Sequence, residues 1–398
     1  MRTNRVLVVE PAASWRRLQH ANEFFFQDLD AQMKEHHRQF LEALMGYERQ
    51  CFLNAQPYER TDQRVDQANG FYERYLTTRL GVLPLRVPRT RSGCFHSQVL
   101  PRYQRREPKI NEALKQVFLL GVSTRQTGRA LATLVEEAVS ASTVSAVAKV
   151  LDEAVSRWHR RPLADHYRYL ILDGVSVRIR LVGKVQRRVA LCAYGLTADG
   201  KRQLIDFLLV KAEAEDTWYG FLWQLWSRGL RGAALELIVT DGHAGLVKAL
   251  GRLWPGVEHQ RCWAHKLRNL ENKLKASQSA CLEEAKLIYQ AEHRTAALKR
   301  FRAWQHRWRS QAPKAVACLE TDLEELLAFY DCPGAHWKRV RTTNVIERLF
   351  VEVRRRIRTM CAFTTRSSCE RILYSVFDRM NTYWSQKPLK AFTQGHLR

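Results

Sequence analysis

The chain has 398 residues, of which 45% are hydrophobic, so it can bury the cores of about two to four domains and is not a disordered tail. Lysine and arginine number 65 against 40 aspartates and glutamates, and the net charge of +25 makes a polyanion, above all nucleic acid, the expected partner. The nine scattered cysteines form no Cys-x-x-Cys pair and no long apolar run is present, which excludes a secreted disulfide framework and a membrane span and predicts a cytoplasmic protein.

The first 109 residues are predicted to form a helical region followed by a small β-module. Residues 1–65 have helical character, and the apolar spacing over 24–52 suits either a homodimer contact or packing on the same domain. Residues 66–109 alternate β-branched, aromatic and basic residues between Gly and Pro, which predicts short strands. A solvated basic face has the same composition, but the interleaved aromatics favour contacts of these arginines with the DNA backbone: Arg86, Arg89, Arg91, Arg105 and Arg106.

Residues 110–161 contain two helical patterns separated by a short turn. The second pattern opens at Ser140 or Ser142, either of which suits a helix N-cap. The pair predicts a helix-turn-helix-like DNA-binding region with Ser142 and Thr143 on the recognition helix. An ordinary helical hairpin is the alternative.

From residue 162 the pattern changes to α/β. Three strands, a helix, a strand, a helix and a last strand are predicted in chain order, which is the order of an RNase H-like core with a mixed five-stranded sheet. The first part of this core is expected over 162–265, an all-α insertion domain over 266–336, and further core helices over 337–398. The predicted strands are 167–179, 185–197, 202–211, 235–242 and 256–265.

Two aspartates and one glutamate are candidates for the chemistry. Asp173 follows the apolar run Tyr-Leu-Ile-Leu and Asp241 follows Leu-Ile-Val-Thr, and each precedes a glycine. A carboxylate in a buried strand is costly unless it is paired or binds a metal, although a strand-end turn also places Asp before Gly. Glu347 lies on a helix predicted over 342–358, where the helix dipole alone would favour a first-turn glutamate. Three convergent acids suit two Mg²⁺ ions and in-line displacement at a phosphodiester.

These motifs, over about residues 65–385, resemble the mutator-type DDE transposases of bacterial insertion sequences. The strings that carry the resemblance include NGFYERYLTTRLG, LILDGVSVRIR, VTDGHAGL, QRCWAHKLRNL and TTNVIERLFVEVRRRIR. The resemblance implies that Asp173, Asp241 and Glu347 form the catalytic triad and hold two Mg²⁺ ions, for which Mn²⁺ would substitute. It also implies an enzyme, associated with the nucleoid, whose double-stranded DNA partners are its terminal inverted repeats and a target. Because two element ends must be held together, a homodimer is the simplest expected arrangement.

Three further residues are expected to support this site. Cys262 and His265 match the Cys-x-x-His signature of the family. Their spacing is also that of half a zinc site, but no second half follows, so a structural or DNA-positioning role is predicted. His243, in the Asp-Gly-His string, is expected to orient Asp241 or contact a phosphate, with helix capping as the alternative.

The C-terminal segment is basic. From Lys338 to Arg398 there are fourteen lysines and arginines and four acids. Consecutive residues point around a helix, so some arginines beyond Glu347 are expected to contact DNA phosphates while others cover the insertion domain. These arginines are Arg354, Arg355, Arg356 and Arg358.

The leading prediction is therefore a transposase that cleaves DNA at its element ends and joins the 3′-hydroxyl to target DNA. A structure-selective nuclease or resolvase on the same core would need only a hydrolytic step. A DNA-binding regulator with a silent acidic site is the third alternative, and the presence of all three acids counts against it.

Overall fold

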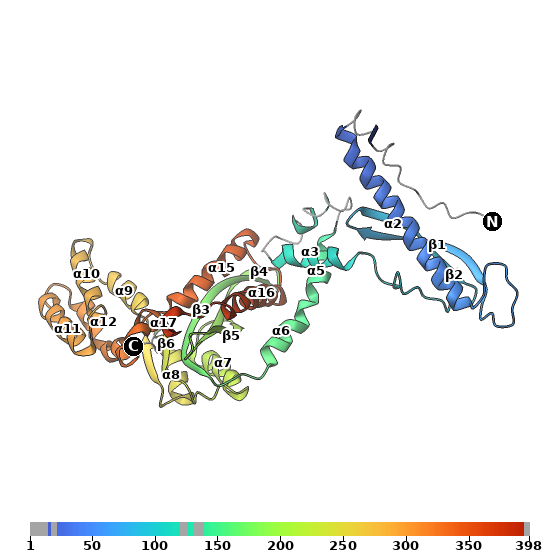
Figure 1. The fold of residues 1–398 in the computed structure, drawn as a ribbon. Helices are drawn as coiled ribbons and strands as arrows, with labels where there is room; N and C mark the ends of the chain where they lie inside the picture. The colour runs from blue at the N-terminus through green and yellow to red at the C-terminus, as the bar shows by residue number, and fades with distance from the viewer. Residues whose placement is uncertain (1–14, 17–21, 120–125, 130–131, 133–138, 394–398) are drawn as a thin grey trace. The chain divides into compact units, whose positions relative to one another are not determined.

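The computed structural model describes residues 15–16, 22–119, 126–129, 132 and 139–393, which form two compact units, Met1–Ala148 and Lys149–Arg398 (Figure 1). Within the described residues, no helix is long and apolar enough to cross a membrane. Each unit is described below by itself.

The first unit is built on a helix and a β-hairpin. Helix α2 (Asn22–Leu53) precedes strands β1 (Ala68–Thr78) and β2 (Gly81–Thr90), which pair antiparallel. Met45 of α2 is fully buried among hairpin side chains such as Leu83 and Leu85. The short strands predicted in this part of the chain are present. The helical prediction is correct over α2 and wrong beyond it, because the chain turns at Asn54, whose φ is 50°. Residues 1–14 and 17–21 lie outside the description.

Short helices close the first unit. Helix α3 (Pro108–Leu119) follows the hairpin, and α5 (Ala141–Lys149) begins after Ser140, whose Oγ accepts the Thr143 N–H at 3.1 Å. The predicted N-cap is therefore present. The second helical pattern of residues 110–161 forms two helices, α5 and α6 (Leu151–Arg160), of which α6 belongs to the second unit. Most of the predicted turn before α5 lies outside the described residues.

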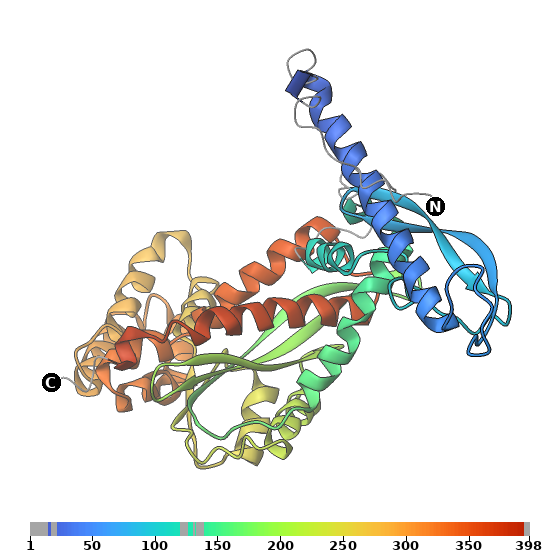
Figure 2. The same cartoon turned by 45° about the vertical axis from the view of Figure 1, so that its right-hand side comes forward.

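A five-stranded mixed sheet forms the centre of the second unit (Figure 2). Its order is β5-β4-β3-β6-β7, with β3 antiparallel to β4, β4 antiparallel to β5, and β6 parallel to both β3 and β7. The predicted strands all form, but the last one ends at Arg261, because Cys262 is already the N-cap of a helix. The strands are β3 (Tyr167–Leu181), β4 (Lys184–Thr197), β5 (Arg202–Val210), β6 (Leu237–Thr240) and β7 (Glu258–Arg261).

Helices cover both faces of this sheet. Helices α7 (Glu215–Ser227) and α8 (Ala244–Leu253) pack against Leu170 and Leu172 of β3. Side chains alternate along a strand, so Ile171 and Asp173 face the other way. On that opposite face, α16 (Arg366–Ser385) packs Phe377 against Phe207 with ring centres 5.2 Å apart.

An all-helical block separates β7 from α15 (Asn344–Met360) in the sequence, which confirms the helical prediction for 266–336 (Figure 1). Both ends of α15 are tied to the sheet region. Thr343 at its start donates to Cys262 Sγ, and Phe363, just beyond its end, exchanges backbone hydrogen bonds of 2.8 and 2.9 Å with β3. The block comprises α9 (Trp263–Glu271), α10 (Ser279–Ile288), α11 (Arg294–Trp308), α12 (Pro313–Thr321), α13 (Leu323–Leu327) and α14 (Trp337–Val340); α17 (Lys390–Thr393) follows α16.

Candidate active site

Strand register places Asp173 beside Asp241. In the parallel pair of β3 and β6, Ile171 lies opposite Val239. Asp173 comes two residues later on β3, and Asp241 comes two residues later directly after the end of β6 at Thr240, so both acids lie at the same level of adjacent strands. Neighbouring strands lie about 4.8 Å apart, which brings the two acids together at one edge of the sheet. Asp173 lies on the face that α15 and α16 cover.

The carboxyl group of Asp173 is held in an unfavourable environment for its charge. Its side chain is only 8% exposed, and burial raises its pKa to about 7. His265 and the Gly174 N–H, which donates to Asp173 Oδ1 at 2.8 Å, lower the pKa, while Asp241 and Glu347 raise it. Asp241 and Glu347 thus lie close enough to Asp173 for their charges to act on it.

Glu347 enters the cluster from the first turn of α15. Its Oε1 lies 3.4 Å from His265 Nε2 and 3.8 Å from an Arg268 guanidinium nitrogen. The Cys262 thiol holds the start of this helix, because Sγ accepts hydrogen bonds from the Thr343 N–H at 3.2 Å and from the Thr343 hydroxyl at 3.4 Å. Cys262 and Thr343 are both fully buried. The Cys-x-x-His pair thus connects α9 to the helix that carries Glu347.

The raised pKa of His265 favours its protonated form beside these acids at neutral pH. A hydrogen bond with Cys262, together with the carboxylates of Asp173 and Glu347, raises its pKa to about 9 despite partial burial. A protonated imidazole between Asp173 and Glu347 offsets part of their repulsion. Cys262 and His265 therefore affect the acids in two ways. The charge of His265 acts on Asp173 and Glu347, and Cys262 fixes the start of the helix that carries Glu347.

His243 contacts Asp241 through its backbone. The His243 N–H donates to Asp241 Oδ1 at 2.9 Å, and the His243 side chain makes no capping hydrogen bond at the start of α8. The contact that orients Asp241 is therefore made by the main chain at position 243.

The donor set of the three acids suits a hard divalent cation. Carboxylate oxygens are the ligands that Mg²⁺ prefers, and a cation would offset the negative charges of the three acids. Over the described part of the chain, no three His, Cys, Asp or Glu side chains are grouped tightly enough to enclose a metal ion.

Comparison with known proteins decides the family. Residues 10–387 match the family described as Transposase, Mutator family. The chain belongs to the Mutator family of transposases. It is 35% identical over 355 residues to the transposase for insertion sequence element ISRM5 of Rhizobium meliloti, covering 89% of each chain. It is also 36% identical over 344 residues to the transposase for IS256 in transposon Tn4001 of Staphylococcus aureus, covering 86% of this chain and 88% of that one.

The arginines predicted to contact DNA lie in different settings in this transposase. Arg86, Arg89, Arg91 and Arg105 are exposed in the first unit, as is Ser142, while the Arg106 guanidinium lies 3.5 Å from the Thr143 hydroxyl. Arg354, Arg355 and Arg358 are exposed on α15. Arg356 is only 6% exposed and donates to Glu352 at 2.8 Å, so it stabilises the interior and is not a surface contact.

One carboxylate beside the triad of this transposase was not singled out from the sequence. Glu213, just before α7, is half-buried, and burial followed by the Asp241 charge raises its pKa. A Cβ at position 174 would lie 2.7 Å from Glu213 Oε1, so Gly174 provides the room for this side chain. The Gly after Asp173 was the available signal, because a glycine next to an acid permits close approach of another group.

Proposed function

We propose that this chain moves its own insertion sequence by binding the terminal inverted repeats, cleaving DNA at the element ends and joining the 3′-hydroxyl to target DNA. The observation that carries the proposal is the convergence of Asp173, Asp241 and Glu347 at one sheet edge in a member of the Mutator family. The partners are double-stranded DNA and a second copy of the chain, since two ends must be joined together.

We further propose that the sheet is an RNase H-like core and that the block from α9 to α14 is an insertion domain. Three antiparallel strands followed by two parallel ones support the first assignment. The position of the helices between β7 and the Glu347 helix supports the second. In this arrangement the sheet positions Asp173 and Asp241, and contacts with the start of the helical block position Glu347.

Cleavage and joining each exchange one phosphorus–oxygen bond for another. In cleavage, a water oxygen bonds to the scissile phosphorus as the bond to the element 3′ oxygen breaks. In joining, that 3′-hydroxyl bonds to a target phosphorus and the target 3′ oxygen leaves. Mg²⁺, when bound, would activate the attacking oxygen and stabilise the leaving one, held by Asp173, Asp241 and Glu347.

The residues around the triad have positioning tasks in this proposal. The protonated His265 holds Glu347 beside the sheet. The His243 N–H fixes one oxygen of Asp241, and the Gly174 N–H fixes one oxygen of Asp173. Asp173 and Asp241 thus each keep a second oxygen for the reaction.

An end-joining assay tests the proposal. Purified protein, Mg²⁺, a labelled duplex carrying the inverted repeat and a plasmid target are expected to yield label joined covalently to the plasmid. Cleavage without joining would favour the nuclease or resolvase. Specific binding with neither reaction would favour the silent regulator.

A further inference from the structure

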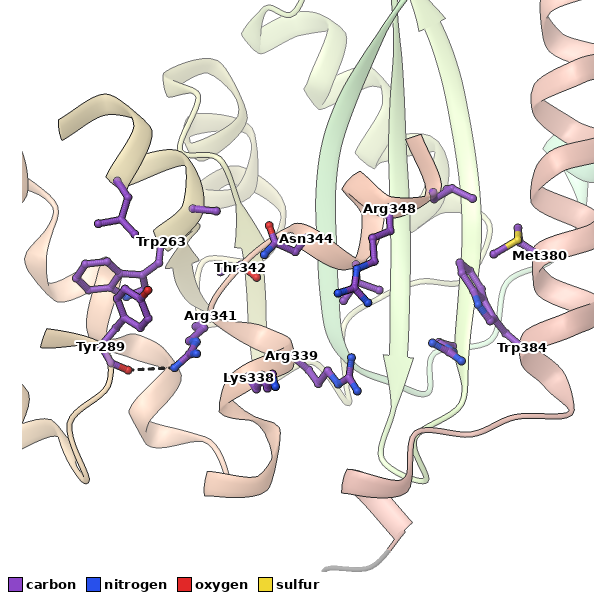
Figure 3. Close-up of a pocket in the computed structure, with 15 residues that line it drawn as sticks. Trp263, Tyr289, Lys338, Arg339, Arg341, Thr342, Asn344, Arg348, Met380 and Trp384 are labelled. Atoms are coloured by element: carbon purple, nitrogen blue, oxygen red, sulfur yellow. Dashed lines mark hydrogen bonds between the residues drawn. The ribbon is translucent and has the colours of Figure 1, made fainter. Parts of the chain in front are cut away.

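A basic cavity of about 390 Å³ lies within the second unit, beside the acidic cluster (Figure 3). Its wall is formed by α9, α14, the first turns of α15, α16 and the start of β5. Five cationic side chains line it, and no aspartate or glutamate does. The five are Arg202, Lys338, Arg339, Arg341 and Arg348.

These cations have no acidic partners. Throughout the described ranges of the chain, no carboxylate lies within ion-pair distance of any of the five. Arg348 extends from α15 and Arg339 from α14 toward the same space (Figure 3). Five uncompensated like charges around one cavity repel one another, which favours an anionic occupant.

Two aromatic rings in the wall of the cavity are in contact with arginine side chains that also line it. The Arg202 guanidinium lies 5.3 Å from the Trp384 ring centre, and that of Arg341 lies 4.7 Å from the Tyr289 ring centre. Arg341 also donates to the Tyr289 carbonyl at 3.2 Å. These contacts hold the guanidinium groups in place, and they occupy ring faces on which DNA bases could otherwise stack. Fixed guanidiniums suit the oxygens of a phosphate.

The cavity adjoins the triad along two elements. On α15, Glu347 faces His265 while the adjacent Arg348 lines the cavity. On α9, His265 faces Glu347 while the neighbouring Ala264 lines the cavity. A DNA strand bound at the three acids would therefore have the cationic side chains of the cavity next to it.

We propose that this cavity binds the phosphodiester backbone of one DNA strand immediately beside the phosphate that is cleaved. The inference rests on the proposed function, because it takes the strand at the triad to be DNA. Its task is to hold the strand in register while the acids act on the neighbouring phosphate, as phosphate contacts do in other DNA-binding proteins.

Phosphate-ethylation interference on the duplex that carries the inverted repeat tests this assignment. The full chain carrying Asp241→Asn is used, so that binding is measured without cleavage. Adding Arg339→Ala and Arg348→Ala is expected to abolish interference at one or two phosphates next to the cut and nowhere else. The salt dependence of binding should also flatten, by about 0.9 in log K per log salt for each lost contact.

Two matched double variants distinguish an effect of the cavity from a general effect of removing positive charge. Arg302→Ala with Arg309→Ala removes two exposed arginines of the helical block and should leave the interference pattern unchanged. Arg339→Lys with Arg348→Lys keeps the charges and should restore most of the salt dependence, which excludes a folding defect as the cause.

An interference pattern of the Arg339/Arg348 variant identical to that of the parent would overturn the inference and leave the proposed function intact. Uniform weakening along the whole duplex would also overturn it. If the parent protein neither binds nor joins the element ends, the proposed function fails and this assignment fails with it.

Discussion

The two sides of the α9–α15 junction have opposite chemistry. On one side lie Asp173, Asp241 and Glu347, where burial, together with the charges of the other two acids, raises the Asp173 pKa to about 7. On the other side, cations surround a cavity that no acid lines. Glu347 and Arg348 are consecutive residues about 100° apart on one helix, so a single backbone supplies both sides.

The difference shows how one helix can serve both chemistry and binding. An acid cluster without bound DNA or metal is destabilised by its own charge, and so is a basic cavity. A DNA strand with its accompanying cations would relieve both, since the phosphate satisfies the arginines and the cations satisfy the carboxylates. The two sides are thus complementary halves of one substrate site in the proposed reaction.

The largest expected effect comes from removing charge on the acidic side alone. Asp173→Asn, Asp241→Asn or Glu347→Gln should lower cleavage by several orders of magnitude while binding to element ends persists, because the basic side is intact. Gel-shift and cleavage assays on the same preparations check this. Glu271→Gln, an exposed acid of α9, should be fully active. Normal cleavage by any one triad variant would remove that residue from the site.

The charge of Asp173 should also be visible in stability. Its folded-state pKa is about 7 against an ordinary 3.8, so the folded protein binds this proton more tightly, and stability is lost as pH rises from about 4 to 7. Asp173→Asn removes this loss and should stabilise the protein at pH 8, without divalent cations, by at most about 4 kcal/mol. Urea unfolding at pH 5 and pH 8 measures it.

A control of opposite sign accompanies this experiment. Hydrogen bonds from Lys201 and Thr197 lower the pKa of Asp199 to about 2, so Asp199→Asn should destabilise the protein at pH 8. Equal unfolding midpoints of Asp173→Asn and the parent protein at both pH values would contradict the buried, charged environment of Asp173.

Substitutions at His265 and Cys262, which connect α9 to the acids, should have smaller effects on activity than substitutions of the acids themselves. His265→Ala removes the cation that holds Glu347, and misplacement of this acid should slow joining by about a hundredfold while end binding changes little. Cys262→Ser keeps a hydrogen-bond acceptor for Thr343 and should fold and retain substantial activity. Stoichiometric zinc in the purified protein, lost together with activity in Cys262→Ser, would instead indicate a metal site at this pair.

The smallest effect concerns Gly174. An alanine Cβ there would lie 2.7 Å from Glu213 Oε1 and 2.9 Å from Val189 Cγ1, so Gly174→Ala should cost about 1–3 kcal/mol of stability. Adding Glu213→Ala should recover part of this loss, because one of the two close contacts disappears. Urea unfolding of the single and double variants gives the coupling; strict additivity would show that Glu213 does not occupy this space.

Much of the catalytic unit could be predicted because it repeats simple patterns. Apolar runs ending in Asp-Gly marked the strands of Asp173 and Asp241, and helical periodicity marked the segment with Glu347. Burial of Arg356 could not be read from composition, since it depends on which side of α15 meets the protein interior. The basic cavity could not be predicted from the sequence for a related reason. Its wall combines side chains from positions 202 to 384, which only the tertiary fold brings together.

The two attachments of α15 restrict how this helix can respond to its substrate. Its start is joined through Thr343 to Cys262, and the segment just after it is joined through Phe363 to β3, the strand that carries Asp173. Seven residues, or about 10 Å of helix, separate Glu347 from Arg354. A helix fixed at both ends, with Ile346 and Val353 buried between them, resists both sliding and rotation. DNA that contacts the exposed arginines would therefore leave Glu347 at a constant position relative to the strand that carries Asp173.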